Sequence, residues 1–291
     1  MDRRIGNFLD KVPNVFSQGA NMKFSKCFLI IFSLILLVCC STGKEKIKIA
    51  GSTTVLPIVQ AAAEEYMNTH PEIDISVRGG GSSIGILSAI NKIIDIGNAS
   101  RKVSKTELEI IREKAHDLIE SEIALDAISI VVHPENPITE LSQQQIRDIY
   151  SGRTNNWRDL GGSDLEIVVI SRDTPSGSFV VFNETVLDEK KVTSKALMLA
   201  SNNAVATNIS FTPGAIGYVG IGYVNDYIKP LRVNGVIPSS ESAKNREYIL
   251  TRKLYMYTTD TSKELAQEFI DFILSERGQQ IVEEQGYIRI N

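Results

Sequence analysis

The sequence predicts an α/β fold made of two lobes, because strands and helices alternate along most of the chain. Three times, a short apolar strand runs into a loop of glycine and hydroxyl residues and then into a helical pattern. Such alternation is typical of layered α/β architecture with mainly parallel sheets. The 291 residues, 43% of them hydrophobic and 23% charged, are enough for roughly two globular domains.

The first lobe is expected to begin with two of these units. The strand Lys46–Ala50 leads into a helix from Pro57 to about Met67. A proline suits the first turn of a helix, because its missing N–H costs nothing there. The strand Ile73–Arg78 leads in the same way into a helix over Ile84–Ile94.

The apolar strand Leu125–Val132 is interpreted as the crossover to the second lobe. That lobe continues with a helix over Ser142–Tyr150. The third unit follows, in which the strand Glu166–Ile170 precedes a helix over Phe179–Leu187.

The chain is then expected to return to the first lobe. Ile216–Val219 and Leu231–Val233 are the candidates for carrying it back, before a strand Lys253–Tyr257 and an amphipathic helix Ser262–Glu276. Two crossings therefore join the lobes. One lobe is expected to contain residues 46–127 and 232–291, and the other residues 128–231.

The early part of the chain carries the features of an export signal. Lys23 and Lys26 precede the apolar residues 27–38, and small or thiol residues follow. This apolar stretch is shorter than the roughly 18 residues of a membrane-spanning helix, so a permanent membrane helix is the weaker interpretation. Residues 1–21 are not apolar, and we hypothesise that Met22 is the initiator within a leader that extends to residue 40.

The motif Leu37-Val38-Cys39-Cys40 resembles the lipobox of bacterial lipoproteins, in which a cysteine carries the acyl chains. The resemblance implies that Cys40 is the lipidated residue. Cys39 is an alternative, because the position before the modified cysteine is usually Gly, Ala or Ser. The mature protein would then be anchored to a membrane outside the cytoplasm. Because no cysteine follows residue 40, the exported part of the chain has neither a disulfide nor a thiol metal site.

The charge pattern argues against several classes of function. The net charge is −4 and basic residues form no run, so electrostatic binding of nucleic acid is not expected. The segment Gly79–Gly85 has neither the spacing of a dinucleotide fingerprint nor the lysine of a P-loop, which argues against nucleotide binding.

The three strand–loop–helix joints favour an anion site. Each joint places Ser, Thr or Gly where a helix begins and its backbone N–H groups are unpaired. Hydroxyl groups add donors, and the guanidinium of Arg172 offers a planar fork. Each loop alone is explained more simply by ordinary caps and turns, but loops at the carboxyl ends of strands meet in open α/β sheets. The hydroxyl residues of this predicted oxyanion cradle are Thr53, Thr54, Ser82, Ser83, Ser176 and Ser178.

Longer motifs extend these joints. They are Gly51-Ser-Thr-Thr-Val-Leu-Pro57, Gly79-Gly-Gly-Ser-Ser83, Asn98-Ala-Ser-Arg101, Ser151-Gly-Arg-Thr-Asn-Asn-Trp157-Arg-Asp-Leu-Gly-Gly162, Arg172-Asp-Thr-Pro-Ser-Gly-Ser178 and Pro213-Gly-Ala-Ile-Gly-Tyr-Val219. Together they resemble the phosphate-binding proteins of phosphate ABC transporters, in the same order from about Lys46 onward. The Trp157 and Pro213 segments are distinctive, because caps and turns alone do not require them.

This resemblance implies a type II periplasmic-binding-protein fold. Two α/β lobes, joined by two crossover segments, would close over inorganic phosphate in the cleft and deliver it to a membrane permease powered by a separate ATPase. The resemblance also implies a monomer that is not an enzyme and needs no cofactor and no metal. By motif, the phosphate contacts fall on Thr54, the Val55 N–H, Ser82, Arg172, Ser176, the Gly177 N–H and Ser178, and the further candidates are Thr53, Ser83, Ser100 and Arg101.

One position differs from some relatives, because Ser100-Arg101 stands where they have Ser-Asp. A hydrogen-bond acceptor separates phosphate, which keeps a proton near neutral pH, from sulfate, since facing lone pairs repel. Arg101 cannot accept. Asp173 or a backbone carbonyl are alternatives, although an ordinary loop carboxylate explains Asp173 more simply. Selectivity for phosphate is inferred from the resemblance only, so a receptor for sulfate, molybdate or tungstate is the alternative function.

Other classes of function fit less well. Gly81-Ser-Ser83-Ile-Gly85 matches the G-x-S-x-G pattern of a hydrolase nucleophile. A hydrolase also needs a base, and none of the three histidines, His70, His116 and His133, has the setting of a catalytic triad. A surface adhesin or signalling lipoprotein on the same fold is a third alternative, but the intact donor set favours retained ligand binding.

Overall fold

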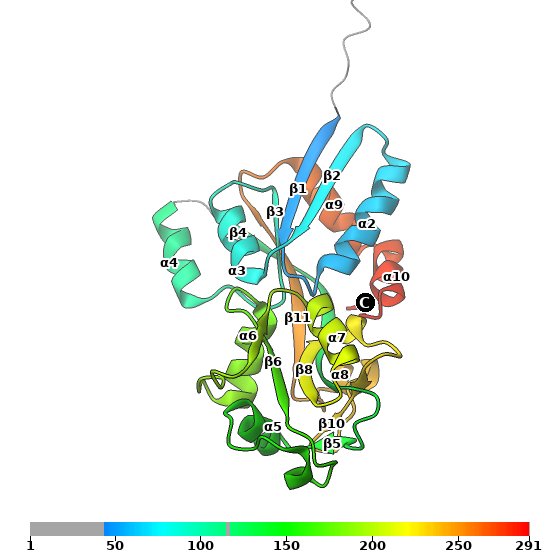
Figure 1. Ribbon diagram of the computed structural model, residues 1–291. Helices are drawn as coiled ribbons and strands as arrows, with labels where there is room; N and C mark the ends of the chain where they lie inside the picture. The colour runs from blue at the N-terminus through cyan, green and yellow to red at the C-terminus, as the bar shows by residue number, and fades with distance from the viewer. Residues whose placement is uncertain (1–43, 115–116, 291) are drawn as a thin grey trace, which may run out of the picture. The chain divides into compact units, whose positions relative to one another are not determined.

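The computed structural model describes residues 44–114 and 117–290, and these form an α/β structure built on a curled sheet (Figure 1). The strands are β1 (Glu45–Gly51), β2 (Ile73–Gly79), β3 (Ile96–Ala99), β4 (Leu118–Val132), β5 (Glu140–Leu141), β6 (Val168–Arg172), β7 (Leu197–Leu199), β8 (Ala215–Gly220), β9 (Lys229–Pro230), β10 (Arg232–Val233) and β11 (Thr251–Thr259). In the main sheet they follow the order β2-β1-β3-β11-β4-β8-β6-β7, and β9 also pairs with β4.

Helices cover both lobes. The α-helices are α2 (Leu56–Thr69), α3 (Ser82–Ile90), α4 (Lys105–Lys114), α5 (Gln143–Tyr150), α6 (Gly177–Phe182), α7 (Asn202–Phe211), α8 (Ser240–Lys244), α9 (Glu264–Leu274) and α10 (Glu276–Glu284). Three short helical segments are η1 (Trp157–Leu160), the π-helical turn η2 (Asn183–Leu187) and η3 (Ile221–Tyr223). None of the helices in the described ranges is both long and apolar enough to cross a membrane.

Two long strands join the lobes. Residues 118–127 of β4 pair antiparallel with β11, whereas residues 128–132 pair antiparallel with β8. β11 continues the first lobe by pairing with β3, beside the parallel pairs of β1 with β2 and β3. In the second lobe, β6 lies parallel to β7 and β8. The predicted α/β architecture of two joined lobes is therefore confirmed.

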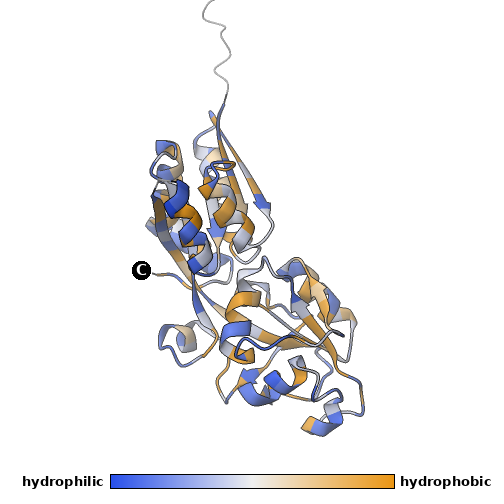
Figure 2. Ribbon diagram, turned by 90° about the vertical axis from the view of Figure 1, so that its left-hand side faces the viewer, coloured by the Kyte–Doolittle hydropathy of each residue, from blue (hydrophilic) through white to orange (hydrophobic). Residues whose placement is uncertain are grey.

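Each lobe buries its own apolar core, and Figure 2 shows apolar residues concentrated along the strands and on the helix faces next to them. In the first lobe, Ile47 and Ile49 of β1 pack in one cluster with Ile58 of α2 and Phe269 of α9. In the second lobe, the ring of Phe182 stacks on that of Tyr218 with centroids 4.2 Å apart. The loops that lie between the lobes therefore have a packed apolar core on each side.

Several helices differ from their predicted bounds for local reasons. The predicted helix Ser262–Glu276 corresponds to α9, which ends at Leu274 because Ser275 leaves the helical conformation. The Oγ of Ser275 accepts from Gly278 N at 3.2 Å and caps α10, a further helix that was not predicted. α3 ends at Ile90, since Lys92 adopts a left-handed φ of 57°. The third predicted helix begins two residues earlier, at Gly177, and changes to a π turn after Phe182.

The return to the first lobe also differs from the prediction. The segment 216–219 lies in β8, which pairs with β4, and Val233 lies in β10, which pairs with β5. Val233, Tyr248 and Leu250 belong to the same apolar cluster as Tyr218. The chain therefore returns along β11. The division at residues 127 and 231 stays a prediction, and this packing favours a second boundary near residue 250.

Candidate anion-binding site

The first loop joins β1 to α2 and lies between the lobes. Thr54 is buried, and its Oγ1 is 3.3 Å from the Oγ of Ser178 in the second lobe. Asn202, at the start of α7, donates from Nδ2 to the Oγ1 atoms of Thr54 and Thr53 at 3.0 and 3.2 Å. The hydroxyl of Tyr223 donates to the backbone carbonyl of Thr53 at 2.6 Å. The first loop is thus fixed by side chains of the opposite lobe.

Val55 closes this loop as the residue before α2, and it is buried. Pro57 occupies the first turn of the helix, as predicted. The N–H groups of the first turn of a helix have no partners within the helix, so they are available to an anion, as the sequence predicts.

The second loop joins β2 to α3 and touches the second lobe through its backbone. Gly81 has a φ of 100°, and a Cβ there would lie 2.7 Å from the carbonyl oxygen of Pro175, so only glycine fits. Ser83 N donates to the same carbonyl at 3.1 Å. The Oγ of Ser82 accepts from Ser100 N at 3.0 Å and lies 3.3 Å from Ser100 Oγ. Two predicted hydroxyls are therefore side by side.

The third loop approaches these hydroxyls from the second lobe. Ser176 caps α6, because its Oγ accepts from Phe179 N at 3.3 Å. Gly177 packs so closely on the first lobe that an added Cβ would lie 2.4 Å from Ser82 Oγ and 2.6 Å from Ser100 Oγ. The structure therefore brings Thr54, Ser82, Ser100, Gly177 and Ser178 together, whereas the hydroxyl of Ser176 serves the helix.

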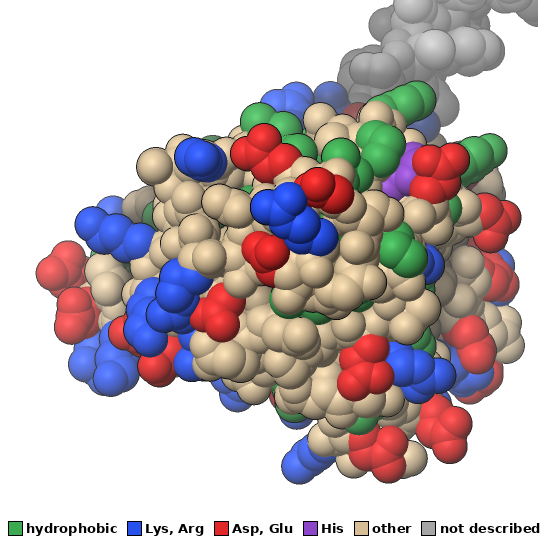
Figure 3. Space-filling view, turned by 60° about the horizontal axis from the view of Figure 1, so that its bottom comes forward, with side chains coloured by type: hydrophobic (Ala, Val, Ile, Leu, Met, Phe, Trp, Pro, Cys, Tyr) green, Lys and Arg blue, Asp and Glu red, His purple; other side chains and the backbone are tan. Residues whose placement is uncertain are grey.

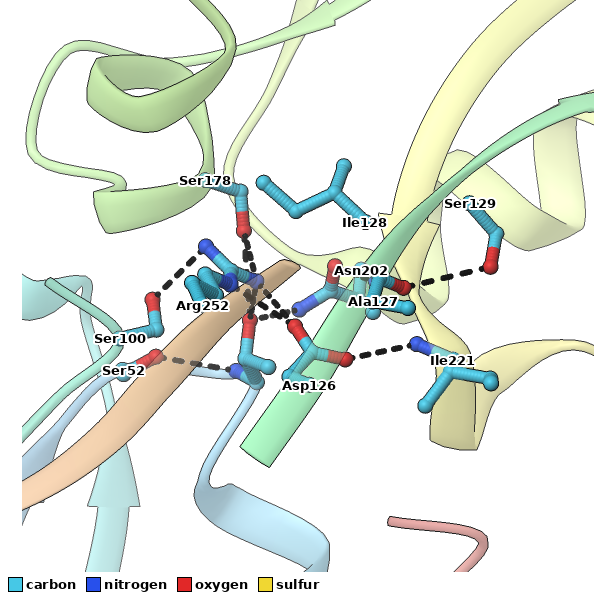
Figure 4. A network of polar contacts seen from close by, with 12 residues as sticks. Ser52, Ser100, Asp126, Ala127, Ile128, Ser129, Ser178, Asn202, Ile221 and Arg252 are labelled. Atoms are coloured by element: carbon cyan, nitrogen blue, oxygen red, sulfur yellow. Dashed lines mark hydrogen bonds and ion pairs between the residues drawn. The ribbon is translucent and has the colours of Figure 1, made fainter. Parts of the chain in front are cut away.

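The cation at the centre of this cluster is Arg252 of β11, which was not among the residues predicted from the sequence. Its Nη2 donates to Thr54 Oγ1 at 3.1 Å and to Ser178 Oγ at 2.9 Å, and its Nη1 donates to Ser100 Oγ at 3.2 Å (Figure 4). Three hydroxyls from three loops and both lobes thus converge on one guanidinium.

Asp126 of β4 holds this guanidinium from behind. Its Oδ2 accepts from Arg252 Nε at 2.8 Å and lies 2.7 Å from Nη2, and its Oδ1 accepts from Ile221 N at 2.9 Å. The carboxylate is fully buried and Arg252 is nearly so. Because buried charges need partners, each of the two crossing strands contributes one member of an ion pair at the point where the lobes meet.

Arg172 lies at the end of β6 and is differently engaged. Its Nε donates to the carbonyl of Leu199 at 3.0 Å and its Nη2 to that of Ala200 at 2.9 Å, which fixes the chain after β7. Among the described residues its Nη1 has no hydrogen-bond partner. Burial lowers the pKa of Arg172 below its ordinary value, and the nearby Asp173 opposes this shift only in part. Its role as a phosphate ligand stays a prediction, with Nη1 as the available donor.

Arg101 forms a separate ion pair with Glu107 of α4. Its Nη1 and Nη2 each donate to one carboxylate oxygen at 2.8 Å, and Nη2 also donates to Ser83 Oγ at 2.8 Å. The charge of Arg101 is therefore balanced within the first lobe. The hydroxyl of Ser83 is occupied by the same guanidinium, so these two predicted site residues support the second loop in this structure.

Glu107 makes the stability of this support dependent on pH. Burial raises the pKa of Glu107, but hydrogen bonds from Arg101 and Ser104 outweigh it, so the pKa lies below its ordinary value of 4.5. The stabilisation is therefore complete above pH 4.5 and is lost as the pH falls through the lowered pKa.

We expect Glu107→Gln to lower the free energy of unfolding at pH 7 by about 3 kcal/mol, because it leaves Arg101 buried without a counter-charge. The difference from the parent protein should shrink below pH 4.5, where the parent carboxylate also becomes neutral. Urea unfolding at both pH values measures it. Glu109→Gln, on the exposed side of the same helix, is the control, and an equal effect of the two substitutions would contradict the role of the ion pair.

Comparison with known proteins shows the family to which the chain belongs. Residues 41–277 match the family model described as the PBP superfamily domain. The phosphate-binding protein PstS of Borreliella burgdorferi is 33% identical over 281 residues, which cover 91% of this chain and 99% of that protein. PstS of Bacillus subtilis is 34% identical over 254 residues, covering 85% of this chain and 83% of that protein. The chain therefore belongs to the family of phosphate-binding proteins PstS.

Solved structures show the same likeness. A putative phosphate ABC transporter substrate-binding protein from Clostridium perfringens, with bound phosphate, is 34% identical with a TM-score of 0.80, and the match covers 85% of this chain and 100% of that one. An ABC-type phosphate transport receptor from Vibrio cholerae is 32% identical with a TM-score of 0.68, covering 83% and 99%. The predicted periplasmic-binding-protein fold is confirmed.

Proposed function

We propose that this protein captures inorganic phosphate outside the cytoplasm and delivers it to the permease of a phosphate ABC transporter. The observation that carries this proposal is the convergence of Thr54, Ser100 and Ser178 on Arg252. These groups are the donors that a tetrahedral oxyanion needs, and they come from both lobes. The relatives named phosphate-binding proteins and the Clostridium structure with bound phosphate support the same ligand.

Binding is expected to depend on directed hydrogen bonds more than on net charge. Arg252 is balanced by Asp126 and Arg101 by Glu107, while Arg172 Nη2 lies 3.8 Å from Asp173 Oδ1. An anion that contacts both lobes favours the arrangement in which they are close, and this shifts the population toward the closed form. The proposed phosphate contacts are Thr54, Ser82 and Ser100 in the first lobe and Gly177 and Ser178 in the second.

A titration of the full chain with phosphate and with sulfate, followed by calorimetry, tests the proposal. We expect one phosphate per chain and a much weaker response to sulfate. Equal affinity for the two anions would favour the alternative of a general oxyanion receptor. Binding of neither anion would contradict the proposed function.

We propose Asp173 as the hydrogen-bond acceptor that separates phosphate from sulfate. Its Oδ1 is buried and has no hydrogen-bond partner within the described ranges, so it does not behave as a capping carboxylate. Asp126 is less suitable, because Arg252 and Ile221 N already engage its two oxygens. A buried carboxylate can accept a hydrogen bond from a protonated phosphate oxygen. Sulfate carries no proton near neutral pH, so it has no donor to offer this carboxylate.

We therefore expect Asp173→Asn to reduce the preference for phosphate over sulfate by at least about tenfold, because the amide can donate to either anion. The ratio of the two dissociation constants is the measurement. Asp226→Asn, at an exposed position of the same lobe, provides the matched control. An unchanged ratio would assign the acceptor to a backbone carbonyl instead.

We also propose that the protein is a monomeric lipoprotein anchored through Cys40, which lies outside the described residues. The lipobox-like motif and the short apolar stretch before it support this anchor. We expect incorporation of labelled palmitate in expressing cells to be lost in Cys40→Ser and kept in Cys39→Ser. The reverse result would assign the lipid to Cys39, and label in both variants would contradict a single anchor.

The remaining classes of function have less support. The family is one of solute-binding proteins, and in this structure Ser83 Oγ of the G-x-S-x-G pattern accepts from Arg101, whereas the ring of His70 stacks on Tyr66. The described residues contain no group of three or more metal-ligating side chains. On the face of the second lobe in Figure 3, basic and acidic side chains are interspersed, which gives that face no single-sign patch for nucleic acid.

A further inference from the structure

A cavity lies at the strands that join the lobes. It has a volume of about 770 Å³, and we call it the hinge cavity. Its lining includes Leu125 of β4 and residues 251–253 of β11. The remaining walls are the end of α8 with the turn that follows it, and the terminal segment at Arg289 and Ile290. The backbone of Ile288 holds this segment against β4 through two hydrogen bonds with Leu125, of 2.8 and 3.1 Å.

The charged groups of the hinge cavity are mostly cations. Lys253 pairs with Glu122 at 2.7 Å, and Glu122 is the only acidic residue among those that line the cavity. Arg289 lies 2.7 Å from Glu276 of α10 and 3.8 Å from Glu283 of the same helix, so carboxylates outside the cavity balance its charge. Lys244 and Arg246 line the cavity with no ion-pair partner in the same part of the chain. Two positive charges without an ion-pair partner are therefore available to a ligand.

Most of the uncharged lining is apolar. Leu125, Tyr248, Ile249 and Ile290 contribute hydrocarbon or aromatic surface, and Ile249 is 38% exposed. A cavity of this volume falls within the range of about 300 to 1,000 Å³ that is usual for sites of small organic ligands. An inorganic anion alone would leave the apolar part unused. Charge and surface together favour an organic molecule with two negative charges and an apolar group.

The hinge cavity and the anion site share structure. Arg252 lines the cavity and donates to Thr54, Ser100 and Ser178, while Leu125 of the cavity directly precedes Asp126. A ligand that fixes one arrangement of β4 and β11 therefore acts on the ion pair between Arg252 and Asp126. Such coupling is reciprocal, so each ligand changes the affinity of the other by the same factor.

We propose that the hinge cavity binds a small organic dianion, such as a phosphate monoester with an apolar group, and that this ligand changes the phosphate affinity of the anion site. Occupation of the cavity is independent of the proposed function, whereas its effect on phosphate binding rests on it. The binding residues are Lys244 and Arg246.

The test uses 1-naphthyl phosphate as the probe and the full chain in saturating inorganic phosphate, which keeps the probe out of the anion site. We expect one probe per chain, no binding of neutral 1-naphthol, and at least about tenfold weaker binding in Lys244→Ala/Arg246→Ala. Lys190→Ala/Lys191→Ala removes the same charge elsewhere on the surface and serves as the control. Absence of probe binding, or an equal loss in both double variants, would overturn the site.

The coupling is measured separately. With the probe present, the dissociation constant of phosphate should shift by at least about fivefold, and this shift should vanish in Lys244→Ala/Arg246→Ala. An unchanged phosphate affinity with the probe bound would overturn the coupling. If the chain bound no phosphate at all, the proposed function would fail, while the probe titration repeated without phosphate would still decide whether the hinge cavity is a site.

Discussion

Replacing Arg252 with methionine is expected to weaken phosphate binding by at least about a hundredfold, because the ligand loses a charge-assisted donor in a buried site. Thr54, Ser100 and Ser178 also lose the group that orients their hydroxyls. Calorimetric titration with phosphate measures the effect. The larger part should appear as faster dissociation of phosphate, since truncation of a buried charge acts mainly on the off-rate.

The substitution also leaves Asp126 buried without its partner, which destabilises the fold. The double variant Arg252→Met/Asp126→Asn removes both charges, so it should recover most of the lost stability and still fail to bind phosphate. Lys253→Met, the exposed neighbour on the same strand, is the control and should bind normally. A folded double variant with phosphate affinity close to that of the parent would show that Arg252 is not a ligand.

Gly177→Ala is expected to weaken phosphate binding by about tenfold to a hundredfold with little effect on the stability of the second lobe. The added methyl would lie 2.4 Å from Ser82 Oγ and 2.6 Å from Ser100 Oγ, both in the first lobe. The φ of Gly177 is not in the left-handed region, so alanine can adopt the local backbone conformation of α6. The substitution therefore opposes the approach of the lobes rather than the folding of either.

Two measurements separate these effects. Phosphate affinity should fall, while the urea midpoint of the ligand-free protein should change little. Val180→Ala, three residues further along α6, tests whether any small change in this helix has the same result. Normal phosphate affinity in Gly177→Ala would mean that the lobes do not close as tightly around the ligand as the contact between Gly177 and Ser82 implies.

Much of the fold follows from local patterns in the sequence. The units that contain β1, β2 and β6 were predicted because their signals are local. Each unit shows an apolar strand, a loop of glycine or hydroxyl residues and a helix start within a short stretch of sequence. The hydroxyls Thr54, Ser82 and Ser178 were selected for the same reason. Their local positions are sufficient to place them at helix starts, and the order of the strands brings them together.

The parts that were missed depend on long-range pairing. Arg252 and Asp126 stand on strands far apart in the sequence, and Asn202 reaches the first loop from the start of α7. One signal was available, because Asp126 is the one charged residue of the predicted strand Leu125–Val132 and a buried charge needs a partner. Neither that signal nor the alternation of β11 identifies which of Arg252 and Lys253 faces the site. The boundary at residue 231 stays a prediction, but Val233 and Tyr248 pack in the apolar cluster of the second lobe, which favours a later return of the chain.

The bonds from Asn202 and Tyr223 to the first loop have a consequence for how a transport receptor of this kind can evolve. Neither residue was a predicted ligand contact, yet both tie Thr53 to the opposite lobe. Each such tie adjusts the fraction of molecules that are ready to bind, and the apparent affinity changes by that fraction. Lineages that live with scarce or abundant phosphate can therefore tune their uptake through these two positions, while the residues that recognise the ion itself remain unaltered.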